Sequence, residues 1–289
     1  MTSLRASPSH PPAPACSVII LTLNEQLNLG SCLESLAAFD DVHVIDSGST
    51  DDTAAIASRF GAKLSANRFR SFGQQRNWGH DQLPLRYAWV LHLDADERMT
   101  PELESEIRDT IAADRGQHAG YYIAERTLLH GRWLRFSGEY PRYQARLVHT
   151  ARMRFIDHGH GQREQSELPF ARLRRPYDHH AFSHGIEHWL HKHVGYAMRE
   201  ADALRQGSLP IAELLGNLIS GPAIRRRRAF KALLKYVPLR PSLRWFYVLV
   251  ICRGVLDGRA GWHYARMMKL YQQIIDLCTI ERQATKEMQ

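Results

Sequence analysis

An apolar run that ends in carboxylates, YAWVLHLDADE at Tyr87–Glu97, most constrains how this chain can fold. A strand in which almost every residue is apolar has both faces buried, as in a mostly parallel sheet. Asp94, Asp96 and Glu97 follow at the carboxyl end of this strand, where open α/β sheets bind their ligands. Two aspartates separated by one residue can bind a hard divalent cation and leave positions for phosphate oxygens. A strand that runs into an ordinary acidic turn is the alternative.

Strands and helices alternate along the first third of the chain. Further strands are expected at Ser17–Leu23, Val42–Ile45 and Lys63–Ser65, each followed by a helical pattern, and Thr100-Pro101-Glu102 has the residues of a helix start. Alternation of this kind indicates right-handed βαβ crossovers. The predicted fold class is therefore α/β, a mostly parallel sheet flanked by helices, with a helical C-terminal extension.

Polar residues follow three of these strands where each strand ends: Asn24 and Glu25, then Asp46 with the turn Ser47-Gly48-Ser49, then the aspartate pair. In a doubly wound sheet these ends lie on one edge and line one crevice. The residues suit a nucleotide, because Asp46 can accept from a base or ribose and the turn offers N–H groups to an anion. The chain has no GxGxxG or GxxxxGK[ST] motif, so neither a dinucleotide fold nor a P-loop NTPase is indicated. Taken alone, such a turn more often caps a helix.

Composition restricts the class of protein and of partner. With 289 residues, 44% hydrophobic and 24% charged, the chain resembles a soluble globular protein of one large domain with an appendage, or of two modest domains. Its formal net charge of +8 favours anionic partners. Four scattered cysteines favour a reducing compartment. Residues 1–15 are expected to be a disordered tail, and no apolar run approaches the roughly 18 residues of a membrane span, so a cytoplasmic location is expected.

Four linked motifs resemble inverting glycosyltransferase family 2, whose members have the GT-A fold. They are SVIILTLNE, VIDSGSTDDT, FGQQRN and WVLHLDADE, in the family's order across about Ser17–Leu103. The later segment GRWLRFSGEYPRYQARLV at Gly131–Val148 is similar to the branch that includes the lipopolysaccharide-core β-1,4-glucosyltransferases. The resemblance weakens after about Leu204. It implies a nucleotide-sugar donor, with UDP as the nucleotide.

The resemblance also implies which residues form the site. Asp94 and Asp96 match the DxD motif, which implies Mg²⁺ or Mn²⁺ on the diphosphate. The nucleotide-sugar site is implied at the residues that match the motifs or lie in their turns: Thr22, Asn24, Glu25, Asp46, Ser47, Gly48, Gln75, Arg76, Asn77 and Asp94.

Inverting transfer needs a general base that deprotonates the acceptor hydroxyl. The candidates are carboxylates beyond the DxD motif: Glu139, Asp157 and Glu164. Relatives in this branch often carry a His-Glu pair after the strand, whereas this chain has FIDHGHGQRE at Phe155–Glu164. Glu164 is the first catalytic candidate and Asp157 the second, with a solvated surface carboxylate as the alternative for each.

Histidines and arginines in the middle of the chain allow more than one interpretation. The histidines occur as an HxH, a pair and a helical i, i+4, i+7 set: His158 and His160, His179 and His180, and His184, His188 and His191. A zinc site is one interpretation, but a polar helix face with acceptor-site histidines near His158 and His160 is preferred. Arg135, Arg142 and Arg146 suit a phosphate or another acidic acceptor, and ordinary strand-edge charge explains them equally well.

The last third of the chain is basic and apolar. Arg225–Arg228 is followed by the apolar segment Leu243–Leu256 and by a helical pattern from Tyr264 to Cys278. This combination is typical of an anchor on an anionic membrane surface, and a helix packed on the catalytic domain is the alternative. The expected domains are thus the tail at residues 1–15, a GT-A catalytic domain at 16–205 and a membrane-associating helical region at 206–289.

The predicted function is metal-dependent, inverting transfer of a hexose from a UDP-sugar to a hydroxyl of a lipid-linked glycan. That acceptor is a lipopolysaccharide core or an exopolysaccharide intermediate, and the enzyme is placed on the inner face of the cell membrane, with no nucleic-acid partner. A polyprenyl-phosphate sugar transferase and a non-catalytic basic membrane or nucleic-acid adaptor are the alternatives. The sugar, the linkage and the oligomeric state do not follow from the sequence.

Overall fold

The chain divides into two compact units. The computed structural model describes residues 13–158, 161–206, 216 and 239–287. The first unit comprises the chain to Leu128 together with Pro141–Ser183, and the second comprises Leu129–Tyr140 and the chain from His184 onward. Most of the expected tail, and the run Arg225–Arg228, lie outside the described residues.

The division differs from the boundary expected near residue 205. Helix α5 (Gly185–Gln206) packs on helix α9 (Gly258–Glu287), and it therefore belongs with the C-terminal helices. Residues 129–140 also join them, because the amides of Phe136 and Ser137 donate to the buried carboxylate of Asp257.

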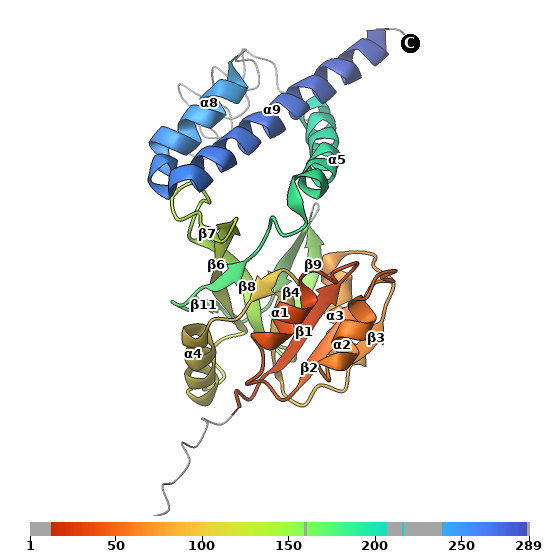
Figure 1. Cartoon of the computed structure of the whole chain (residues 1–289). Helices are drawn as coiled ribbons and strands as arrows, with labels where there is room; N and C mark the ends of the chain where they lie inside the picture. Colours follow the sequence, from red (N-terminus) through yellow and green to blue (C-terminus); the bar gives the residue numbers. More distant parts are fainter. Residues whose placement is uncertain (1–12, 159–160, 207–215, 217–238, 288–289) are drawn as a thin grey trace, which may run out of the picture. The chain divides into compact units, whose positions relative to one another are not determined.

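The first unit is built on a sheet whose N-terminal half is parallel (Figure 1). The four parallel strands, in spatial order, are β3 (Lys63–Ala66), β2 (Val42–Asp46), β1 (Ser17–Thr22) and β4 (Trp89–Asp94). The sheet continues as a mixed sheet through β8 (Arg142–His149), β6 (Gly120–Leu129), β12 (Tyr177–His179) and β5 (Glu97–Arg98), and β11 (Phe170–Arg172) pairs with β6. A separate hairpin is formed by β9 (Arg154–His158) and β10 (Gly161–Gln165). The helices are α1 (Leu29–Glu34), α2 (Thr53–Arg59), α3 (Phe72–Gln82) and α4 (Pro101–Ala112).

Both faces of β4 are buried, as its apolar run predicts. Leu91 and Leu93 belong to the core cluster that α1 and α4 cover, whereas Val90 belongs to the cluster below α3. All three are fully buried, which contributes about 1.5–3 kcal/mol per side chain. The α/β class predicted from this run is confirmed, with antiparallel pairs from β8 onward.

Helix starts follow the residues that cap them. The Thr100 hydroxyl accepts from the Leu103 amide at 3.3 Å, and Pro101 occupies the first turn of α4, as predicted. The Ser71 hydroxyl accepts from the Gln74 amide at 3.3 Å and starts α3 in the same way.

The buried carboxylate of Asp41 holds together the amino-terminal ends of the parallel strands. These ends lie at the edge of the sheet opposite the DxD motif. Asp41 accepts from Ser17 Oγ at 2.5 Å, from the Arg86 amide at 2.8 Å and from Lys63 Nζ at 2.6 Å. His43 Nε2 lies 3.0 Å from Asp41 Oδ1, the oxygen that also accepts from Lys63. Burial opposes ionisation of Asp41, but Lys63, Ser17 and Arg86 outweigh it and hold the pKa of the carboxyl well below its usual range.

We expect Asp41→Asn to lower the free energy of unfolding at pH 7 by about 2–4 kcal/mol, because an amide leaves several of these donors unmatched. The pKa of Asp41 is lower in the folded protein than the unfolded value of about 3.9. Ionised Asp41 therefore stabilises wild type above about pH 3.9, and this stabilisation is lost as the pH falls further. Denaturant titrations should therefore show the difference shrinking below about pH 4. Asp40→Asn is the control, since Asp40 pairs with an exposed Arg86 and should matter by less than about 1 kcal/mol. Equal stability of Asp41→Asn and wild type at pH 7 would disprove the role.

The second unit consists of α5, α9, a short strand β7 (Arg132–Trp133) and a broken helical segment. Five buried residues of α9 follow one another at alternating steps of four and three, which is the spacing of a seam against another helix: Gly261, Ala265, Met268, Gln272 and Ile275. The Tyr271 hydroxyl donates to Glu200 on α5 at 3.0 Å. The helical pattern predicted from Tyr264 to Cys278 is therefore confirmed as part of α9.

The apolar segment Leu243–Leu256 forms no single helix. It divides into α8 (Arg240–Phe246), a π-helical turn η2 (Tyr247–Ile251) and a 3-10 turn η3 (Gly254–Asp257). The break falls at Arg253, whose φ is +58°, and at Gly254, where a Cβ would lie 2.6 Å from the Val248 carbonyl oxygen. In the described part of the chain, no helix has the length and apolar character needed to cross a bilayer.

Candidate active site

The site begins with three strand ends that the sheet places side by side. Thr22 pairs with Asp46 across β1 and β2, and Leu21 pairs with Asp94 across β1 and β4. Adjacent strands lie about 4.8 Å apart. The residues predicted to share one edge of the sheet therefore do so.

Asp46 organises the turn that follows β2. Its Oδ2 accepts from the amides of Gly48 and Ser49 at 3.1 and 2.9 Å, and its Oδ1 accepts from Ser49 Oγ at 2.5 Å and Thr22 Oγ1 at 3.1 Å. Burial opposes ionisation, but these donors, led by Ser49, lower the pKa of Asp46. Because a carboxylate has about four acceptor positions, Asp46 shapes the turn more than it offers free positions to a base or ribose. The left-handed Gly48, with φ +104°, completes the turn.

The turns after β1 and β2 are bonded to each other. The Asn24 side chain accepts from the Thr50 amide at 2.9 Å, and the Asn24 amide donates to Ser49 Oγ at 2.8 Å. The Glu25 amide donates to Thr53 Oγ1 at 2.8 Å, which leaves the Glu25 carboxylate to accept from Asn28 at 2.7 Å. The two turns therefore form one rigid rim at this edge.

Helix α3 attaches to this rim and to the β9–β10 hairpin. Gln75 Nε2 donates to Ser47 Oγ at 3.3 Å, which brings α3 to the turn after β2. Asn77 exchanges two hydrogen bonds with the backbone of Phe155 on β9, at 2.8 and 3.0 Å. Asn77 is thus engaged in holding the hairpin, whereas Gln75 and Arg76 face the strand ends.

Two buried arginines hold Asp94. Arg76 Nη2 donates to Asp94 Oδ1 at 3.1 Å, and Arg146 Nη2 donates to Asp94 Oδ2 at 2.7 Å and also to Glu97. Burial opposes ionisation of Asp94, but Arg146 and Arg76 hold its pKa well below the usual range. Burial and the charge of Arg146 lower the pKa of Arg76 to about 10. Arg76 Nε and Nη1 are buried without a hydrogen-bond partner among the described residues, and such donors suit a nearby oxyanion.

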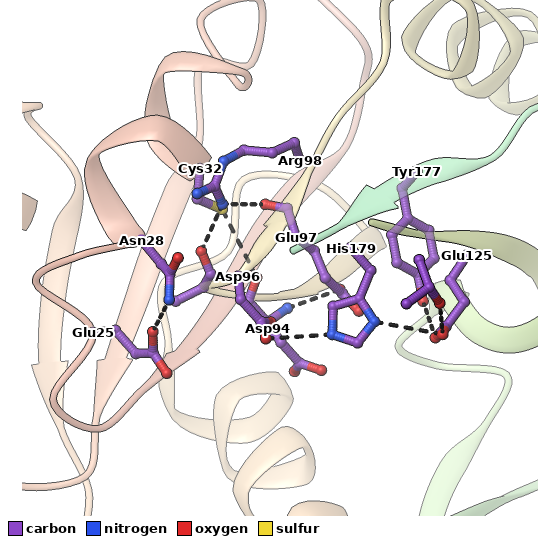
Figure 2. A network of polar contacts seen from close by, with 12 residues as sticks. Glu25, Asn28, Cys32, Asp94, Asp96, Glu97, Arg98, Glu125, Tyr177 and His179 are labelled. Carbon is purple, nitrogen blue, oxygen red and sulfur yellow. Dashed lines mark hydrogen bonds and ion pairs between the residues drawn. The ribbon is translucent and has the colours of Figure 1, made fainter. Parts of the chain in front are cut away.

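Asp96 faces a histidine from a distant strand (Figure 2). His179 Nε2 lies 3.3 Å from Asp96 Oδ2, and His179 Nδ1 lies 3.4 Å from Glu125 Oε1. Burial disfavours charge on His179, but Asp96 and Glu125 outweigh it and raise its pKa to about 10. Glu125 is itself buried and accepts from Arg142, from Thr127 and from the Tyr177 hydroxyl.

The donor set fits a divalent cation next to a diphosphate. Asp96 Oδ2 and His179 Nε2 face each other and both side chains keep part of their surface exposed, so a cation between them would have to replace the proton on Nε2. Asp94 is about one-third exposed, although both of its oxygens already accept from arginines. No group of three or more His, Cys, Asp or Glu residues suited to a metal occurs among the described residues, so phosphate oxygens would have to complete the coordination.

The two predicted catalytic carboxylates lie on the β9–β10 hairpin. Asp157 is exposed and accepts from Ser71 Oγ at 2.7 Å and from Gln74 Nε2 at 3.2 Å, and these bonds lower its pKa. Glu164 is half-buried and accepts from the Tyr122 hydroxyl at 3.3 Å. Tyr122 and Glu125 are three positions apart on β6, so their side chains point to opposite faces of the sheet. Glu139, the third candidate, belongs to the second unit and pairs with Arg244.

The three arginines that the sequence offered for an acidic acceptor, in the segment Gly131–Val148, have different surroundings. Arg146 is buried in its pairs with Asp94 and Glu97, so it serves those carboxylates and is not exposed to an acceptor. Arg142 is about half exposed and pairs with Glu125. Arg135 is exposed and belongs to the second unit, where it lies over Trp133.

Of the histidines considered from sequence, His179 joins the site. His184 and His188 stack on each other at 4.7 Å at the start of α5, in the second unit. The side chain of His158 and all of His160 lie outside the described residues. His179 and Glu125 were not assigned to the site from sequence, and the His179-His180 pair was the one signal that pointed to this strand.

Comparison with known proteins agrees with the motifs. The model of glycosyl transferase family 2 matches residues 17–163. The lipopolysaccharide core biosynthesis glycosyltransferase LpsC of Rhizobium meliloti is 28% identical over 144 residues, which are 48% of this chain and 52% of that protein. An uncharacterized glycosyltransferase of Rickettsia conorii is 35% identical over 109 residues, 37% of this chain and 38% of that protein. The chain thus spans about half or less of the length of these relatives.

Solved structures give a more distant likeness. Glucosyl-3-phosphoglycerate synthase from Mycobacterium tuberculosis, in complex with Mn²⁺, UDP and glucosyl-3-phosphoglycerate, is 20% identical, with 39% of this chain and 44% of that chain covered and a TM-score of 0.33. This likeness is too distant to indicate a substrate. The family match covers about half of the chain and includes all three strand ends, which confirms the predicted family and enzyme class: the protein belongs to glycosyl transferase family 2.

Proposed function

We propose that this chain transfers a hexose from a UDP-sugar to an acceptor hydroxyl, with inversion at the sugar carbon. The observation that carries the proposal is the placement of Asp94 and Asp96 beside the Thr22–Asp46 pair, at the carboxyl ends of adjacent parallel strands. Ligands of open α/β sheets bind at this edge. The choice of UDP rests on the family motifs.

The chain's own residues would hold the donor and its leaving group in place. Asp96, together with His179 once Nε2 has lost its proton, would hold a Mg²⁺ or Mn²⁺ ion, which when bound neutralises charge on the leaving diphosphate. Arg76 and Arg146 fix the carboxylate of Asp94, and Glu125 fixes the ring of His179 so that Nε2 faces Asp96. The bonded rim of Asn24, Glu25 and the Asp46 turn would border the nucleotide.

The acceptor is proposed to be a lipid-linked glycan, in a lipopolysaccharide core or an exopolysaccharide. Support comes from the name of the relative LpsC and from the segment Gly131–Val148. The protein would then work at an anionic membrane surface, on the inner face of the cell membrane. A polyprenyl phosphate is the second candidate acceptor within the same family. The family match disfavours a non-catalytic adaptor.

The test is UDP release from a panel of UDP-sugars, with and without Mn²⁺ or Mg²⁺. We expect slow hydrolysis of one donor that depends on the metal. Asp109→Asn, an exposed change on α4, should behave as wild type. No release from any UDP-sugar would contradict the proposal for UDP, and GDP- and dTDP-sugars would then be compared in the same assay.

Glu164 and Asp157 are the two candidates for the general base. Hydrogen bonds lower the pKa of Asp157 and make it a weaker base, whereas the contact with Tyr122 places Glu164 on the sheet face opposite Glu125. The two carboxylates are therefore tested together. We expect Glu164→Gln to lower the rate of donor hydrolysis by about 10²–10⁴-fold and Asp157→Asn by less than about tenfold. Both changes preserve the size of the side chain. The contrary outcome is that neither variant loses rate and that both transfer the sugar to polyprenyl phosphate as fast as wild type. That outcome would exclude a hydroxyl acceptor and support the lipid phosphate.

A further inference from the structure

Large apolar side chains gather on the exposed side of the turns between α8 and α9, within the second unit. The segments α8, η2, η3 and the start of α9 pack on one another, so their outward side chains form one surface. We call this surface the apolar corner; its members are between 46% and 64% exposed and are Phe246, Val250, Ile251, Val255, Leu256 and Trp262. Contiguous exposed apolar surface of this kind marks a contact with another molecule.

The apolar corner is hollowed by a pocket of about 400 Å³. The rings of Trp245 and Trp262 are 5.4 Å apart in its wall. The other apolar lining residues are Leu249, Val250, Val255 and Leu256, and Arg253 is the charged member. Water in such a pocket finds few hydrogen-bond partners. The pocket therefore suits hydrocarbon, such as the end of an acyl chain.

The segment that carries the apolar corner is basic in sequence, and two of its arginines, Arg240 and Arg244, pair with Asp276 and Glu139. Residues 239–275 contain six Lys and Arg residues and a single acid, Asp257. Asp257 is buried and accepts from the amides of Phe136 and Ser137, so it adds little negative charge at the surface. Arg253 and Arg259 are both exposed, and neither has an ion-pair partner in the part of the chain that the structure describes.

We propose that the apolar corner inserts into the surface of an anionic bilayer, with Arg253 and Arg259 at the level of the lipid headgroups. Apolar and aromatic side chains bordered by arginines are what such an interface binds. A symmetric contact between two copies is disfavoured, because it would bring the same arginines together. This inference deepens the membrane association proposed above. Vesicle binding is measured without donor or acceptor, so either proposal can fail while the other stands.

The test is co-sedimentation of the intact chain with vesicles of phosphatidylcholine, with or without phosphatidylglycerol. We expect Ile251→Glu with Leu256→Glu to weaken binding by more than about tenfold, since two apolar side chains leave the bilayer. The control is Leu277→Glu with Ile280→Glu, which changes two equally exposed apolar residues near the other end of α9 and should bind as wild type. Equal loss in this control would overturn the assignment of the surface.

The arginines are tested separately. Arg253→Asn with Arg259→Gln should weaken binding to the anionic vesicles by about 25-fold, or about fivefold for each charge, and leave the weak binding to phosphatidylcholine alone unchanged. Asparagine is chosen because it tolerates the positive φ at position 253. Circular dichroism confirms that each variant is folded. Absence of vesicle binding by wild type would overturn the proposal, as would a dimer that Ile251→Glu with Leu256→Glu dissociates.

Discussion

Asp96→Asn is expected to lower the rate of UDP release from the preferred donor by about a thousandfold or more. An asparagine keeps the shape of the side chain but removes the charge that faces His179 and, in our proposal, the cation. Charge stabilisation of a leaving group by a metal contributes several kcal/mol, and about 4 kcal/mol corresponds to a thousandfold in rate.

The fold should tolerate this change. Asp96 is partly exposed, so the melting temperature of Asp96→Asn should stay within a few degrees of wild type. Steady-state UDP release and a thermal melt on the same preparation separate the two effects. Wild-type activity in a folded Asp96→Asn protein would show that this carboxylate holds no catalytic metal.

Arg146→Met is expected to be the most destabilising single change in the site, by about 3–5 kcal/mol. Methionine fills much of the same volume but leaves Glu97 buried without its charged partner and Asp94 with one arginine instead of two. Burial already raises the pKa of Glu97 to about 7 in the presence of Arg146. The loss should appear in denaturant titrations monitored on the first unit.

Arg142→Met is the matched control for this change. Arg142 lies on the same strand and also pairs with a buried carboxylate, but its own side chain is 52% exposed, so its loss should cost less than about 1 kcal/mol. Equal destabilisation by the two substitutions would show that the buried cluster around Asp94 has no special role in stability.

The sheet and its strand ends could be predicted because their signals are local. The apolar run before Asp94 and the turn residues after Asp46 each occupy a few consecutive positions. Hydrophobic periodicity and turn chemistry act over such short segments. Strand alternation then brings the ends of β1, β2 and β4 to one edge, which the pairing of Thr22 with Asp46 confirms.

The partners of these aspartates could not be predicted in the same way. His179 lies on a strand of three residues, too short to show a periodic pattern, and Arg146 reaches Asp94 across 52 positions of sequence. Nothing near Glu125 in the sequence shows that it meets the same histidine. The two units also differ from the expected domains for a similar reason, because residues 129–140 join the second unit through the carboxylate of Asp257.

Calorimetry of UDP binding, with and without Mn²⁺, tests the central claim most directly. We expect Mn²⁺ to strengthen UDP binding to wild type and to Glu164→Gln by at least about tenfold. The reason is that a cation held by Asp96 would also bind the diphosphate, so the binding of Mn²⁺ and the binding of UDP favour each other. In Asp96→Asn and His179→Ala this effect of Mn²⁺ should be lost. Equal affinity for UDP with and without Mn²⁺ in wild type, or a metal effect that persists in both variants, would contradict the account.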